Sequence, residues 1–236
     1  MTMFSAIAAM IPYMDSTMLI LIPGILLAAW AQSKISSTYA QYSRVANQRG
    51  LTGAQVARYI LDNSNLQNIT IEPVRGKLTD HYDPRSKVLR LSEGVYANQS
   101  VAALGIAAHE VGHAIQDATN YGPMRLRGAI VPLAALGGNL SMILVLAGLF
   151  IGGAGNLITI GAIMFLFTVI FQLVTLPVEF DASKRALRIL DTGILTPSEV
   201  EGAKRVLNAA AWTYVAAAVT GILSFLRILL LARRRS

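Results

Sequence analysis

The sequence predicts a membrane protein that is mainly α-helical and carries a small β-hairpin. Hydrophobic residues make up 54% of the 236 residues and charged residues only 14%, a balance that is too apolar for an ordinary soluble domain. The apolar residues also gather in long stretches, which is typical of membrane-spanning helices. One basic region between these stretches contains β-rich runs separated by turn residues, and this pattern indicates a hairpin.

The basic residues fit the same fold class. A net charge of +7 and an isoelectric point near 9.9 could favour nucleic-acid binding. However, the basic residues lie beside apolar segments and end in the run 233–235, without the basic and aromatic interleaving of a nucleic-acid site. Lys and Arg collect on the cytoplasmic side of membranes and bind anionic head groups there. We therefore expect a lipid bilayer as a partner and no nucleic acid.

Residues 1–31 are predicted to form an N-terminal transmembrane anchor. The chain is continuously apolar from Met18 to Ala31 and has no basic residue before Lys34, which places the N-terminus outside. Because the positively charged region of a signal peptide is missing, we expect the anchor to be uncleaved. Fourteen residues fall short of a hydrocarbon core of about 30 Å, so the span is expected to begin near Ile11 or Pro12.

Residues 32–127 are predicted to form a domain on the cytoplasmic side, because turn residues are frequent there and no apolar run is long enough to span. Leu78–Tyr82 and Lys87–Ser92 have the composition of strands. Asp83–Ser86 supplies the turn between them. Ile69–Val74 is also rich in β-forming residues. We expect a small β-hairpin that leads into a helix.

A transmembrane helical hairpin is predicted over residues 128–176. Gly128–Ile151 and Leu157–Leu176 are each long enough to span, and the second segment is expected to end at Pro177. The uncharged segment Gly152–Asn156 would form the turn between them. Basic residues flank the hairpin on both sides, which places both of its outer ends inside.

The remaining chain is divided into a charged helix over residues 177–205 and an apolar helix with a basic tail over residues 206–236. The run 196–199, Thr-Pro-Ser-Glu, is typical of a helix start. Ala209–Ala232 is expected to cross the membrane a fourth time. A helix that is only partly embedded is the alternative, because this segment is alanine-rich and contains Arg227.

The motif His109-Glu110-Val111-Gly112-His113 lies late in an alanine-rich helical run, Ser100–Ala118. Residues i and i+4 share one face of a helix, so both imidazoles can reach one metal ion. Neutral imidazoles bind zinc and leave a coordination place for water, whose pKa falls towards about 7. Glu110 would then accept the proton. The H-E-x-x-H motif is the zincin signature and predicts a Zn²⁺ site.

The third ligand must be His, Asp or Glu, because the chain has no cysteine. A chain that crosses the membrane twice returns to the face that it left, and Glu179 is the first carboxylate after that return. A glutamate at the membrane interface is an equally good interpretation of Glu179 from the residues alone. His81, the third of three histidines, is a rival ligand because a set of three histidines also suits zinc.

The order of these parts resembles the YugP-type neutral zinc metallopeptidases. The resemblance covers nearly the whole chain. Three local runs carry it: Leu78–Pro84 (LTDHYDP), Lys87–Ser92 (KVLRLS) and Pro177–Ser183 (PVEFDAS). The chain is more distantly similar to the HtpX-type membrane peptidases and the CAAX-processing zinc endopeptidases. In those relatives, a glutamate after the transmembrane hairpin is the third zinc ligand, within an E-x-x-x-D pattern.

Carried over by position, the resemblance implies a zincin-like metallopeptidase domain with Zn²⁺ as cofactor. His109, His113 and Glu179 would be the metal ligands, and Glu110 would be the general base. The chain departs from the distant pattern at one place, because Ser183 stands where those relatives have an aspartate.

An aspartate in that place would orient a zinc-bound histidine through its other ring nitrogen. In this chain Asp181, Ser183 and Asp117 are all candidates for that role, and the sequence leaves the choice among them open.

These observations predict a membrane-embedded zinc-dependent endopeptidase that acts on membrane or membrane-associated proteins. The alternative is a zinc-binding scaffold or adaptor without catalysis, but such a protein does not need Glu110. An edge strand near the metal helix holds the substrate in zincins generally, and Lys87–Leu91 is the candidate strand. A hairpin that only covers the helix is the alternative. Oxyanion donors could be Tyr82, Tyr96 or Tyr214, and the sequence does not separate them.

Overall fold

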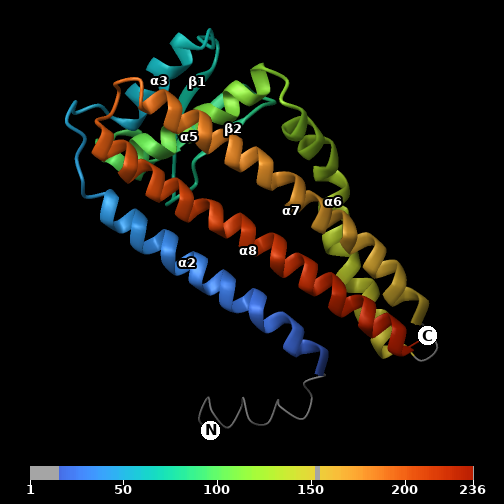
Figure 1. The fold of residues 1–236 in the computed structure, drawn as a ribbon. Helices are drawn as coiled ribbons and strands as arrows, with labels where there is room; N and C mark the ends of the chain where they lie inside the picture. The colour runs from blue at the N-terminus through green and yellow to red at the C-terminus, as the bar shows by residue number, and fades with distance from the viewer. Residues whose placement is uncertain (1–15, 152–154, 236) are drawn as a thin grey trace. The chain divides into compact units, whose positions relative to one another are not determined.

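The computed structural model describes residues 16–151 and 155–235, which are mainly helical (Figure 1). In chain order the elements are η2 (Ser16–Leu21), α2 (Ile22–Tyr42), α3 (Gly53–Asn63), β1 (Thr70–Val74), β2 (His81–Asp83), β3 (Val88–Ser92), α4 (Glu93–Tyr96), α5 (Val101–Ala118), α6 (Gly122–Phe150), α7 (Gly155–Leu190) and α8 (Pro197–Arg235). The expected start of the first span near Ile11 or Pro12 lies outside the described residues. Residues 152–154, the middle of the expected hairpin turn, also lie outside them.

The chain divides into two compact units. The described part of one unit comprises residues 16–28, 132–151, 155–170 and 216–235. The other unit comprises residues 29–131 and 171–215. The second unit contains the H-E-x-x-H motif and Glu179, so the candidate site lies within a single unit.

The first unit consists of apolar helical segments. By length and composition, four helices of the described chain can cross a membrane: Ser16–Tyr42, Gly122–Phe150, Gly155–Leu190 and Pro197–Arg234. Within this unit, α6 and α7 pack closely, because a Cβ on Gly137 would lie 2.3 Å from the Met164 carbonyl oxygen. Large apolar side chains such as Met142, Ile143 and Phe150 are exposed, as expected for a surface that faces lipid. A mainly α-helical membrane protein is therefore confirmed.

The helix does not end at Pro177, where the second spanning segment is expected to end. Helix α7 continues through Pro177 to Leu190. Proline lacks an N–H and removes one hydrogen bond of the helical ladder, but neighbouring helices can compensate within a membrane protein. The separate helix expected over residues 177–205 is therefore the end of α7, a turn and the start of α8. Helix α8 is likewise continuous across residues 205 and 206.

The second unit contains a three-stranded sheet in the order β1-β3-β2. The predicted hairpin is present, with β2 antiparallel to β3, and β1 adds a parallel partner on the other side of β3. The expectation that Lys87–Leu91 is a free edge strand is wrong, because β3 is the central strand and pairs on both sides. Sequence alone did not reveal that β1 would join the sheet, since the pairing partners of a strand are set by the tertiary fold.

Helix α5 lies at the centre of this unit and packs against α3, α4, β2 and β3 (Figure 1). Its first half is almost wholly buried, including Val101, Leu104 and Ala108. Small side chains on α5 allow α8 to approach, because a Cβ on Gly105 would lie 3.2 Å from the Ala203 Cβ. Neighbours on several sides therefore hold the helix that carries the motif.

Candidate metal centre

The histidines of the motif lie on one face of α5, as predicted. The Ser100 hydroxyl caps the helix by accepting a hydrogen bond from the Ala103 N–H at 3.2 Å. Nine residues further on, the His109 and His113 rings meet edge to face, with centroids 4.7 Å apart. His113 is buried and His109 is partly buried. The local helix alone thus places two imidazoles side by side.

Gly112 brings α7 against this face of α5. A Cβ at this position would lie 2.7 Å from the Ala182 carbonyl oxygen, so a side chain would push the two helices apart. The absence of a side chain on the helix surface lets the α7 backbone approach the two histidines.

Glu179 of α7 reaches the two histidines. Its Oε2 lies 3.3 Å from His109 Nε2 and 3.6 Å from His113 Nε2. The residue is 3% exposed, and its Oε2 has no hydrogen-bond partner among the described residues. Buried polar atoms are normally satisfied, so three converging donor atoms without a shared partner indicate a place for a cation. Together, His109, His113 and Glu179 could hold a metal ion.

Gln116 determines how His113 presents its ring. The Gln116 amide nitrogen donates to the Val178 carbonyl at 2.8 Å and to Asp181 Oδ2 at 2.9 Å. Its oxygen Oε1, 3.0 Å from His113 Nδ1, can only accept a hydrogen bond. His113 Nδ1 must therefore carry the proton, and in the neutral ring the Nε2 lone pair faces Glu179.

The pKa of His113 is raised by the carboxylates around its ring. Burial by itself lowers the pKa of this ring, but the Glu179 and Glu110 carboxylates more than offset that effect and raise it. A positive charge is thus favoured next to the Glu179 carboxylate. Either a proton on His113 or a metal ion between the three side chains can supply it.

His109 has a different partner. Ser183 Oγ lies 3.1 Å from His109 Nδ1, and a hydroxyl can donate or accept. The contact therefore orients the His109 ring without fixing its tautomer. Of the three candidates left open by the sequence, Ser183 contacts a motif histidine directly, whereas Asp181 acts on His113 through Gln116. Asp117 contacts neither ring and instead accepts hydrogen bonds from Tyr82 and Lys87.

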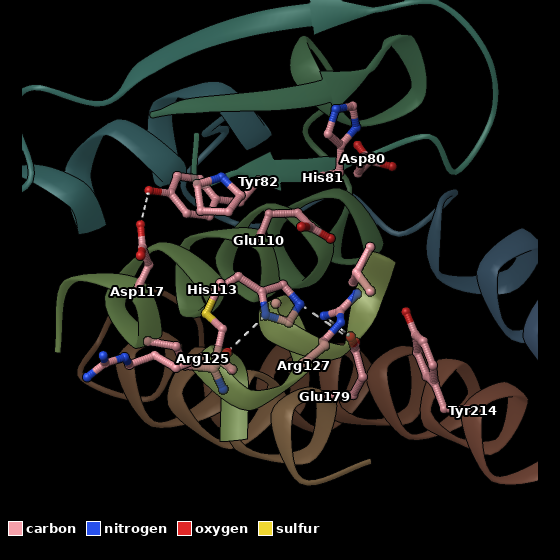
Figure 2. Close-up of a pocket in the computed structure, with 15 residues that line it drawn as sticks. Asp80, His81, Tyr82, Glu110, His113, Asp117, Arg125, Arg127, Glu179 and Tyr214 are labelled. Atoms are coloured by element: carbon pink, nitrogen blue, oxygen red, sulfur yellow. Dashed lines mark hydrogen bonds and ion pairs between the residues drawn. The ribbon is translucent and has the colours of Figure 1, made fainter. Parts of the chain in front are cut away.

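The second oxygen of Glu179 is held by Arg127 of α6. Arg127 Nη1 lies 3.2 Å from Glu179 Oε1, and Figure 2 shows the guanidinium group beside the carboxylate. Metal-binding carboxylates are commonly hydrogen-bonded through their free oxygen. One oxygen of Glu179 thus faces the histidines while Arg127 restrains the other.

The other predicted residues take positions around this cluster. Glu110 is buried and, like His113, lines the cavity drawn in Figure 2. His81, the rival third ligand, is exposed on β2 with its Nδ1 2.8 Å from the Thr79 carbonyl oxygen. It lines the same cavity but is not part of the three-residue cluster. Burial and the hydrogen bond to Asp117 raise the pKa of Tyr82 well above its ordinary value.

Two cavities flank the cluster, with volumes of about 440 and 450 Å³. The first is lined by β2, α5 and the start of α6, including His81, His113 and Arg127. The second is lined by α2 and α8, including Ile35 and Ala210. Asp80, Glu110, Glu179 and Tyr214 line both cavities, so these residues stand where the two cavities meet.

A helix that carries two histidines and an adjacent glutamate, together with a carboxylate from a second helix, is the arrangement typical of zinc metallopeptidase sites of the H-E-x-x-H type. Comparisons with known proteins agree with this class. The family model described as "Putative neutral zinc metallopeptidase" matches residues 17–233, so the chain belongs to that family.

One relative is the "Putative membrane protease YugP" of Bacillus subtilis (strain 168). It is 46% identical over 206 residues, which cover 87% of this chain and 91% of the relative. No solved structure matches this chain. The resemblance inferred from the sequence is therefore confirmed at the level of the family.

Sequence reasoning did not single out Gln116 or Arg127. Gln116 lies three residues after His113 on the same face of α5, so its spacing was a usable signal. Arg127 was interpreted only as a basic flank of the hairpin. Nothing in the sequence connects it with Glu179, because the contact joins residues 52 positions apart on different helices.

Proposed function

We propose that this protein is a membrane-embedded zinc endopeptidase. His109, His113 and Glu179 would hold the zinc ion, and Glu110 would act as general base. The observation that carries the proposal is the convergence of three buried or partly buried donor side chains, with potential ligand atoms within 4.8 Å of one another. The family suggests a peptidase and implies zinc.

The residues of the cluster fit zinc. Two imidazoles and one carboxylate form the ligand set of several catalytic zinc sites, in which a fourth position stays open for water. Gln116 leaves the His113 Nε2 lone pair free for a metal ion, and Glu179 Oε2 lacks any other partner. When bound, zinc would lower the pKa of water and polarise a carbonyl group.

Glu110 supplies the acid and base chemistry. Its carboxylate accepts a proton from the attacking water as the new bond forms between the water oxygen and the peptide carbonyl carbon. The carbonyl π electrons move onto the carbonyl oxygen. When the tetrahedral species collapses, the C–N bond breaks and Glu110 returns the proton to the leaving amine nitrogen.

The cavities on both sides of Glu110 support cleavage within a chain rather than at its end, because a peptide can extend in both directions. Strand β2 is the candidate for holding that peptide. It pairs only with β3 among the described strands, and His81 and Tyr82 line the first cavity. An extended substrate could pair with the free edge of β2 through main-chain hydrogen bonds.

We further propose that the site faces the cytoplasm and acts on membrane or membrane-associated proteins. Basic residues on both sides of the predicted transmembrane hairpin support this orientation. The chain has no cysteine, so an Asn68→Cys variant offers one exposed label. A membrane-impermeant maleimide should label it in inverted vesicles and not in intact cells, whereas the reverse result would overturn the orientation.

The Glu110→Gln variant tests the proposed function. Acid and base catalysis is typically worth about 10²–10⁴ in rate, so the variant should lose at least that factor in kcat on fluorescein-labelled casein while keeping zinc at the wild-type stoichiometry. Cleavage by the wild type should also stop with a chelator and return with added zinc. A zinc-loaded wild type that cleaves nothing would favour the scaffold, and an active Glu110→Gln variant would remove Glu110 from the mechanism.

A further inference from the structure

Tyr214 of α8 lies where the two cavities meet. It lines both of them, as do Asp80, Glu110 and Glu179. Two of these three neighbours are the proposed general base and a proposed metal ligand. Tyr214 therefore stands at the junction of the two cavities, where a bound peptide would pass the reacting groups.

The tyrosine side chain is directed into this place. Figure 2 shows the ring beside Glu179 with its hydroxyl pointing into the cavity. The hydroxyl interacts electrostatically with the Glu179 and Glu110 carboxylates and with the Arg127 guanidinium, and it makes a hydrogen bond to Glu179. The side chain is half-buried, so the hydroxyl can meet a ligand without a large change of conformation.

The other two tyrosines that the sequence offered as oxyanion donors are placed differently. The Tyr82 hydroxyl donates to Asp117 Oδ2 at 2.7 Å, and Tyr96 lines neither of the two cavities. The Arg127 guanidinium is paired with Glu179 Oε1. The structure thus separates the three tyrosines that the sequence left equal.

We propose that Tyr214 is a catalytic residue whose hydroxyl donates a hydrogen bond to the substrate carbonyl oxygen as negative charge develops on it. This inference rests on the proposed peptidase function. The proton stays on Tyr214 throughout, while the π electrons of the carbonyl group move onto its oxygen and return when the C–N bond breaks. A donor placed in this way stabilises the transition state more than the ground state.

A purely positioning role makes a different prediction. If the hydroxyl served only to orient Glu179, its loss would weaken zinc binding, since partners of metal ligands typically contribute about 10–100-fold to metal affinity. If the hydroxyl stabilises the developing oxyanion, zinc affinity stays the same and turnover falls. Metal affinity and kcat therefore separate the two roles.

The test compares Tyr214→Phe with wild type on a peptide from casein that the wild type cleaves. Loss of one oxyanion donor typically costs about 10²–10³ in kcat. We expect a fall of that size with KM within about twofold. Zinc affinity, measured by chelator competition, should be unchanged. A phosphinic analogue of the same peptide, which mimics the tetrahedral species, should bind more weakly by a similar factor.

Tyr96→Phe is the matched control, because it removes a tyrosine hydroxyl of the same unit outside both cavities. It should leave kcat, KM and zinc affinity at wild-type values. If Tyr214→Phe is unstable by thermal melting, Tyr214→His keeps a donor and should retain more activity than a Tyr214→Leu variant of comparable stability. Wild-type kcat in Tyr214→Phe, or equal activity of the His and Leu variants, would overturn the inference.

Failure of this inference is distinguishable from failure of the proposed function. If wild type cleaves casein and Glu110→Gln does not, the peptidase function stands, and the Tyr214 variants decide the inference alone. If wild type, zinc-loaded and folded, cleaves neither casein nor its peptides, the proposed function itself fails, and the inference falls with it.

Discussion

His109 and His113 come from adjacent turns of α5, whereas Glu179 comes from α7. On α5, the helical period alone puts the two imidazoles on one face, so any stable helix over these residues would pair them. Glu179 joins them only because two helices meet at a particular place. The α5 half of the site depends on local structure, and the α7 half depends on the tertiary fold.

Three contacts produce the meeting of α5 and α7. Gly112 allows the close approach to Ala182, Gln116 binds the α7 backbone at Val178, and Ser183 reaches back to His109. Groups on both helices, Gly112 and Gln116 on α5 and Ser183 on α7, thus fix the position of the α7 half. Changes to each contact should affect metal binding to different extents, and these differences test the comparison.

The largest effect is expected when the carboxylate of α7 is removed. Loss of a residue that hydrogen-bonds a metal ligand typically lowers metal affinity by about 10–100-fold. Glu179→Ala should lower zinc affinity by more than this, because only the two imidazoles remain as ligands. The measurement is zinc content after dialysis, together with chelator competition. His81→Ala is the control and should keep wild-type zinc. If the two results were exchanged, His81 would be the third ligand and the α7 half of the site would be wrong.

The difference between the two halves also explains which residues of the site could be predicted from the sequence. The α5 helix, its two histidines and the adjacent Glu110 follow from spacing, and the structure places them on one helix as expected. Glu179 was predicted from membrane topology and from a family resemblance, because no local pattern connects it with the motif. The contact between Arg127 and Glu179 was missed for the same reason.

The errors in the fold have similar physical causes. The end of a helix at Pro177 is a sound local expectation, since proline removes a backbone donor, but α7 continues through it to Leu190. Lys87–Leu91 was the candidate edge strand, with a hairpin that only covers the helix as the alternative, because the sequence of a strand does not state its partners. Strand β1 pairs with β3 and leaves β2 at the edge instead.

A smaller effect is expected when the hydrogen bonds of Gln116 are removed. Gln116→Leu keeps a similar volume but loses the acceptor for His113 and the donor to Val178 and Asp181. Zinc affinity should fall by about 10–100-fold, and melting should occur at a lower temperature, because a buried carbonyl loses its partner. Gln67→Leu, at an exposed site on the α3 side, controls for loss of an amide. Unchanged zinc affinity in Gln116→Leu would show that Gln116 does not position His113.

The smallest effect is expected at Ser183. Its hydroxyl orients the His109 ring without fixing the tautomer. Ser183→Ala should therefore weaken zinc binding by less than Gln116→Leu does, by about 10-fold, the low end of the range for residues that hydrogen-bond a metal ligand. Chelator competition on both variants in parallel checks the order. A larger loss in Ser183→Ala would mean that His109, rather than His113, depends more on its partner.

The most direct test of the central claim is X-ray absorption at the zinc edge of the purified, zinc-loaded protein. We predict a first coordination sphere of nitrogen and oxygen at about 2.0–2.2 Å with no sulfur, and scattering from two imidazole rings. In His113→Ala the imidazole contribution should fall to one ring, and in Glu179→Ala it should stay at two if metal is retained at high zinc. Three imidazoles in the wild type, or none, would contradict a site built from His109, His113 and Glu179.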